Sequence, residues 1–127
     1  MINYDKRQSL LIVTTHRGRP WMKQGTKEFR NEYDRYILKL LIKEYYISRP
    51  ELSKAIGLTL SFVREFDNGT RSFGATALDQ FEELVFSKYE PLLKVHEFDL
   101  NQIKEQLESI ESEDELEEFR LNNFEMI

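Results

Sequence analysis

The stretch RPELSKAIGLTLSFVREFDNG, residues 49–69, decides the predicted fold. Ser48 and Glu51 have the S-x-x-E spacing of a capping box, which predicts that a first short helix begins near Arg49. Gly57 can adopt the positive φ of a tight turn, so this helix is expected to stop there. The spacing therefore predicts two short helices that cross at a glycine turn, which is a helix-turn-helix.

The second helix of the pair is expected to run from Leu60 to Asp67. The side chain of Thr59 can cap its N-terminus, and Asn68-Gly69 is a typical C-terminal stop. Its inward residues are spaced three and four apart, as the buried face of a helix requires, and they are Phe62, Val63 and Phe66. The predicted function, described below, depends on this second helix.

A wider pattern runs through the same stretch and into the helix that follows it. Its positions are Leu52-Ser53, Gly57-Leu58-Thr59, Val63, Phe66-Asp67-Asn68-Gly69-Thr70-Arg71, Leu78, Phe81 and Leu84. In this register the chain resembles the Xre/Cro-like helix-turn-helix family over roughly residues 37–84, and the combined spacing is more specific than any single dipeptide. The resemblance implies a sequence-specific DNA-binding regulator, repressor-like and of the phage or bacterial type.

Carried over residue by residue, the resemblance also implies a set of DNA-contacting positions. The family's reading positions fall on Thr59, Leu60, Ser61, Arg64, Glu65 and Asn68. Arg71 holds the place of a basic residue near the DNA backbone, so a phosphate contact is implied there. Two positions depart from the family pattern. Leu60 stands where a polar reader is common, and Glu65 puts a negative charge on the face that would meet DNA.

Length and composition predict a small cytoplasmic protein. A chain of 127 residues fits one domain with appendages. The absence of cysteine from the sequence excludes disulfides and thiolate chemistry. We find no signal-peptide pattern and no run of about 20 apolar residues, so a cytoplasmic protein without a membrane span is expected.

Catalytic and cofactor motifs are not found in the sequence. The two histidines, His16 and His96, lie in separate segments and match no metal-ligand spacing. The sequence contains neither a P-loop nor a G-x-G-x-x-G motif, the two glycine-rich patterns that bind phosphates. No spacing indicates a pair of catalytic carboxylates either. We therefore expect no enzymatic activity, no metal site and no cofactor.

The net charge of −5 is unevenly distributed along the chain. Residues 1–49 carry eleven Lys/Arg against five Asp/Glu, residues 50–96 carry five against seven, and residues 97–127 carry two against eleven. Such asymmetry predicts partners better than the total charge does. A basic front end and an acidic back end are compatible with a nucleic-acid binder despite the negative sum.

Residues 1–25 are predicted to form a basic arm or a short β element. Residues 9–15 are apolar and β-branched, as in a strand. Arg-Gly-Arg-Pro at residues 17–20 resembles the core of an AT-hook, in which arginines lie in a narrow A·T minor groove. Arg17 and Arg19 are thus candidate minor-groove residues. The alternative is a hairpin turn with exposed arginines.

Residues 26–95 are predicted to form an all-α, lambda-repressor-like helix-turn-helix bundle. From Thr26 the hydrophobic period changes to 3.6 residues, and an apolar stripe from Phe29 to Tyr45 predicts a long amphipathic helix. A further helix is expected over about residues 75–89. The basic residues of the long helix form either a solvated face or a phosphate-contacting one, and they are Lys27, Arg30, Arg35, Lys39 and Lys43.

Residues 96–127 are predicted to form an acidic tail of two helices, the first starting at Asp99 and the second at Ser112. The apolar stripe of the first helix is too short for an independent coiled coil and comprises Leu100, Ile103, Leu107 and Ile110. It must dock on the domain, on a second copy or on another protein. The acidic run at residues 111–118 is either a solvated helix face or a mimic of the charge of DNA.

Two functions follow from these observations. In the first, the chain is a transcriptional regulator that binds double-stranded DNA as a homodimer, with Thr59, Ser61 and Arg64 facing base edges in the major groove. In the second, it is a small acidic inhibitor or adaptor that keeps the helix pair as a scaffold and binds a nucleic-acid enzyme.

Overall fold

The computed structural model describes residues 22–124, and every regular element within that range is an α-helix. The all-α class is therefore confirmed for this part of the chain. The predicted β element at residues 9–15 lies outside the described residues. The helices in chain order are α1 (Lys27–Tyr45), α2 (Arg49–Ile56), α3 (Leu60–Asp67), α4 (Ala75–Lys88), α5 (Glu90–Val95), α6 (Glu97–Glu108) and α7 (Glu113–Asn123).

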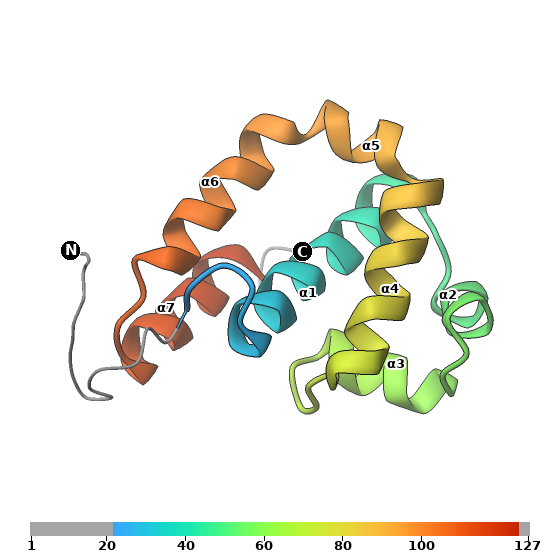
Figure 1. Cartoon of the computed structure of the whole chain (residues 1–127), viewed down its shortest axis with the longest axis horizontal. Coiled ribbons are helices and arrows are strands. Elements are labelled where there is room, and N and C mark those ends of the chain that lie inside the picture. Colours follow the sequence, from blue (N-terminus) through green and yellow to red (C-terminus); the bar gives the residue numbers. More distant parts are fainter. Residues whose placement is uncertain (1–21, 125–127) are drawn as a thin grey trace.

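Helix α1 is the element on which both parts of the hydrophobic core are built. Its C-terminal half buries Ile37, Leu38 and Leu41 against α2, α3, α4 and α5. Its N-terminal half buries Phe29 against α6 and α7 in a second cluster. Figure 1 shows this arrangement, with α2, α3 and α4 on one side of α1 and α6 and α7 on the other. Tyr33 packs against both clusters and joins them.

The acidic tail packs on its own chain. Leu100 belongs to the cluster formed with α2, α3, α4 and α5, whereas Ile103, Leu107 and Ile110 belong to the cluster that contains Phe29. None of these four aliphatic side chains is more than 6% exposed. Burying each one stabilises the fold by about 1.5–3 kcal/mol relative to leaving it in water. Of the three docking partners that the sequence left open, the stripe uses its own domain.

The boundaries of α2 and α3 follow the predicted caps. Ser48 Oγ accepts a hydrogen bond from the N–H of Glu51, and Thr59 Oγ1 accepts one from the N–H of Phe62. Gly57 ends α2 with a φ of 76°. These local signals need only neighbouring residues, and each of the predicted helix ends in this stretch is confirmed.

The predicted start of the first tail helix is wrong. The D-x-x-Q spacing placed it at Asp99, whereas α6 begins at Glu97 with His96 at the N-cap and no side-chain cap. His96 is the only residue between α5 and α6, and it is at once the C-cap of the first and the N-cap of the second. The imidazole of His96 instead forms a 2.9 Å hydrogen bond with the hydroxyl of Tyr45.

Gly57→Ala is expected to lower the free energy of unfolding by about 1–2 kcal/mol, because an L side chain is strained at positive φ. A Cβ at this position would meet no atom within 4 Å, so steric clash adds nothing to the loss. Urea denaturation measures the effect. Gly57→Asn is the matched control and should lose less, because Asn tolerates the left-handed conformation. An Ala variant as stable as the parent would show that the turn relaxes to negative φ.

No helix within residues 22–124 combines the length and the apolar character that crossing a membrane requires.

Candidate nucleic-acid interface

Helix α3 buries one face and presents the other to solvent. Val63 and Phe66 are 1% and 0% exposed, and they anchor the inner face in the core. Ser61 and Arg64 are exposed on the outer face. Across the described part of the chain, the Arg64 side chain makes no hydrogen bond and no ion pair. The structure thus leaves two of the predicted reading residues available to a partner.

Three other predicted reading residues have structural tasks. Thr59 is exposed, but its hydroxyl oxygen already caps α3. Asn68 Oδ1 accepts hydrogen bonds from the N–H of Thr70 at 2.9 Å and from its hydroxyl at 2.7 Å, which closes the turn after α3. Leu60 is half-buried at the start of the helix. The Asn68 side-chain amide nitrogen keeps its capacity to donate.

Glu65 and Arg71 form an ion pair on the surface beside α3. The Nε of Arg71 lies 2.7 Å from Glu65 Oε1, and its guanidinium lies 4.7 Å from the centroid of the Phe62 ring. Over residues 22–124 only the Nε edge of this guanidinium is hydrogen-bonded, so both Nη groups can still donate to an anion. The negative charge of Glu65, which departs from the family pattern, is therefore matched by Arg71.

Asp67 fixes α3 to the two preceding helices. Its carboxylate is 3.0 Å from Lys39 Nζ of α1 and accepts a 2.7 Å hydrogen bond from Arg49 Nε of α2. Asp67 is only 6% exposed, so this three-way contact is shielded from water on most sides. Shielding strengthens the attraction between the charges. The contact therefore positions the C-terminal end of α3 against α1 and α2.

Three of the five basic residues of α1 pair with acidic side chains or are buried within the protein. Arg30 pairs with Asp79 and Glu82, and Lys39 pairs with Asp67. Neither alternative raised by the sequence, a solvated face or a phosphate-contacting face, describes Arg35, which is 1% exposed. The basic front end therefore presents fewer free cations than the residue count indicates. Among the five, Lys27 and Lys43 are exposed.

Arg35 lies beneath the C-terminal end of α3 and is the structural residue that sequence reasoning missed. Its Nε donates to the carbonyl oxygen of Phe66 at 2.6 Å, and its Nη2 donates to that of Arg71 at 3.2 Å. Burial lowers the pKa of Arg35, and the neighbouring carboxylate of Glu32 opposes this shift. The available signal was Leu38, because a residue three positions before a buried leucine shares its helix face.

The remaining predicted features divide between exposed surface and undescribed chain. Arg17 and Arg19, the candidate minor-groove residues, lie outside the described residues. The acidic run at residues 111–118 is exposed except for Leu116, as a solvated helix face would be, and it leaves Ser61 on α3 uncovered. Among residues 22–124 there is no group of three or more His, Cys, Asp or Glu residues that could hold a metal ion.

No protein-family model, no curated protein and no solved structure matches this chain.

Proposed function

We propose that the protein is a DNA-binding transcriptional regulator with a lambda-repressor-like helix-turn-helix, and that α3 enters the major groove. The observation that carries this proposal is the outer face of α3, where Ser61 and Arg64 are exposed and unoccupied while the inner face is fixed in the core. In Figure 1, α3 lies at the edge of the molecule. An α-helix with its side chains is about 10–12 Å across, which suits a major groove about 12 Å wide.

The proposed contacts divide into base reading and backbone binding. Ser61 and Arg64 face base edges, and Thr59 beside them can still donate its hydroxyl proton while its oxygen caps α3. Arg can donate to two acceptors of guanine at once. Arg71 binds a phosphate through its free Nη groups, while Phe62 and Glu65 hold the guanidinium in place. Backbone contacts of this kind set the register of the protein on DNA, and base contacts supply the sequence preference.

A homodimer on a two-fold symmetric site completes the proposal. Apolar surface for such a contact is present where α4, α5 and α6 follow one another. Phe86, Val95 and Phe98 are 48%, 74% and 74% exposed there. Sedimentation of the full chain with and without a two-fold duplex tests this part of the proposal.

Arg64→Ala is expected to weaken binding to a preferred site by about 1–3 kcal/mol, because it removes donors to a base edge. The site is first selected from randomised duplexes, and affinities are then measured by fluorescence anisotropy at several salt concentrations. Binding should show sequence preference and a negative slope of log affinity against log salt. Lys94→Ala, which removes an exposed cation from α5, is the control for net charge.

The results of this titration can also contradict the assignment. Equal weakening on every sequence would move Arg64 from base reading to phosphate contact. No binding to any duplex, even at low salt, would reject the regulator.

The alternative function is that of an acidic inhibitor or adaptor that binds a nucleic-acid enzyme. The observation that favours it is the exposed acidic surface of α7, where Glu113, Asp114, Glu117 and Glu118 face solvent. The pairing of Arg71 with Glu65 also lowers the positive charge beside α3. Such a protein should be captured with an enzyme in a pull-down and should ignore duplexes in the titration.

A further inference from the structure

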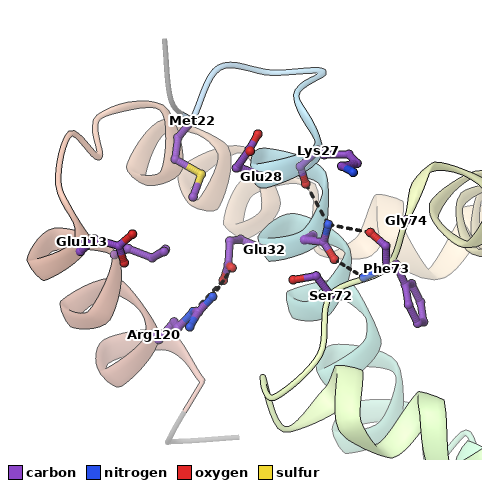
Figure 2. A pocket seen from close by; sticks show the side chains of 11 residues that line it. Met22, Lys27, Glu28, Glu32, Ser72, Phe73, Gly74, Glu113 and Arg120 are labelled. Carbon is purple, nitrogen blue, oxygen red and sulfur yellow. Dashed lines mark hydrogen bonds and ion pairs between the residues drawn. The ribbon is translucent and has the colours of Figure 1, made fainter. Parts of the chain in front are cut away.

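A line of charged side chains connects α7 to the C-terminal end of α3. At one end, the Nε and Nη2 of Arg120 donate to the two carboxylate oxygens of Glu32 on α1, with the Nε bond at 3.0 Å. Glu32 Oε2 also lies 3.1 Å from Arg35 Nη1. At the other end, Arg35 donates to the carbonyl oxygens of Phe66 and Arg71. Figure 2 shows Arg120 pointing from α7 toward Glu32.

The middle of this line is shielded from water. The side chains of Glu32 and Arg35 are 5% and 1% exposed, so water cannot readily replace either partner. Arg120 is 38% exposed and closes the line on the solvent side. Arg guanidinium and carboxylate groups that make two parallel hydrogen bonds fix each other's orientation as well as their distance. A change at Arg120 therefore acts on Glu32 first, which either shifts with Arg35 or takes up water from the pocket that Glu32 and Arg120 line.

A pocket of about 470 Å³ separates α7 from the loop that follows Arg71. Its walls include Glu113 and Leu116 of α7, Glu28 of α1, and residues 72–74 of the loop (Figure 2). Asn31 of α1 anchors the far side of the loop, because its amide donates to the Phe73 carbonyl and accepts from the Phe73 N–H. The near side of the loop, at Arg71, depends on Arg35.

We propose that Arg120 is a positioning residue for α3 and for the loop that carries Arg71. Glu32 shares its negative charge between two guanidinium groups. Without Arg120, the whole charge attracts Arg35, and this attraction competes with the hydrogen bonds from Arg35 to the carbonyls of Phe66 and Arg71. Arg120 therefore keeps Arg35 under the end of α3. The consequence for DNA rests on the proposed function, in which α3 and Arg71 contact the duplex.

This link makes α7 a regulatory element of the DNA-binding face. A partner that binds α7 and displaces it from α1 would destabilise the end of α3. Coupling between two sites is reciprocal. DNA that orders the end of α3 would in turn hold α7 more firmly on α1. Substitutions along a contiguous network of residues that links two sites can change the coupling between them by about 2- to 30-fold.

The test compares amide NMR spectra of the full chain without DNA. In Arg120→Met, the amide signals of Asp67 and Ser72 should move, because each follows a carbonyl that Arg35 binds. Arg120→Lys keeps the charge but loses the paired donors, so it should cause smaller shifts at the same amides. Lys104→Met is the matched control, since it removes a cation from α6, where the ammonium lies over Tyr33 and not beside Glu32. It should leave both amides unchanged.

The duplex titration follows with the same variants. Affinity of Arg120→Met for the selected site should fall about 2- to 30-fold, and Lys104→Met should bind within about twofold of the parent. Unmoved Asp67 and Ser72 amides in Arg120→Met would overturn the proposal. If that variant does not fold, unmoved amides in Arg120→Lys would overturn it. Shifted amides in a protein that binds no duplex would keep the link and reject the DNA-binding function alone.

Discussion

Arg35→Met is expected to lower the free energy of unfolding by about 3–5 kcal/mol, the usual loss when one member of a buried ion pair is removed. The change leaves Glu32 with Arg120 as its remaining cation, and it removes the donors to the carbonyls of Phe66 and Arg71. It also removes the guanidinium that lies 4.7 Å from the Phe66 ring. Methionine keeps an unbranched apolar stem, so the loss reports mainly on charge and hydrogen bonding.

Urea denaturation followed by circular dichroism measures this loss. Lys43→Met is the matched control, because Lys43 is an exposed cation on the same helix. Its effect should stay within about 0.5 kcal/mol, as for most surface substitutions. If Arg35→Met behaved like the control, the buried line of charges would have no part in holding α3 against α1.

Asp34 is the second site with a large expected effect, and the effect depends on pH. Its side chain is almost completely buried. Burial raises the pKa of Asp34 to about 10, and the neighbouring carboxylate of Glu82, to which protonated Asp34 can donate, adds to the shift. Burial alone would raise the pKa of Glu82 as well, but hydrogen bonds from Arg30 and Asp34 lower it. Asp34 is therefore the protonated member of this carboxyl pair.

The direction of the pH dependence follows from proton binding. Between the ordinary pKa of 3.8 and the folded-state value of about 10, the folded protein holds a proton on Asp34 that the unfolded chain has lost. The free energy of unfolding must therefore fall as pH rises through this window. The contribution of Asp34 is up to about 1.4 kcal/mol for each pH unit.

Asp34→Asn should remove this contribution, because an amide has a similar shape and carries no titrating proton. Urea denaturation between about pH 5 and pH 9, a range inside that window, should show the variant gaining on the parent as pH rises, by up to about 1.4 kcal/mol for each unit. Asp79→Asn is the control, since Asp79 belongs to the same ionic cluster but is 72% exposed. Parallel curves for Asp34→Asn and the parent would show that Asp34 is ionised in the folded state.

The helix ends show what the sequence could predict. Ser48, Thr59 and Ser112 cap helices through hydrogen bonds to backbone N–H groups three residues ahead, and Gly57 ends α2 at positive φ. Each of these signals acts within one turn, so neighbouring residues suffice. The start of α6 was mispredicted because it depends on how α5 leads into α6 through His96, which no local spacing encodes.

The candidate site was predictable on its outer face and not beneath it. The family resemblance named Ser61 and Arg64, helical spacing assigned Val63 to the inner face, and the structure exposes the first two and buries the third. The pairing of Glu65 with Arg71 depends on the path of the loop after α3, and the burial of Arg35 depends on what packs opposite α1. Charges counted along a sequence do not show which of them face each other after folding.

The shared use of α1 has a consequence for cooperativity. Because one continuous helix contributes Ile37 to one hydrophobic cluster and Phe29 to the other, neither cluster can come apart without disturbing the same backbone segment. The basic and acidic parts of the chain are therefore tied into one folding unit, although their charges differ in sign. Any ligand that stabilises α3 should be detectable as slower hydrogen exchange in α7, on the other side of α1.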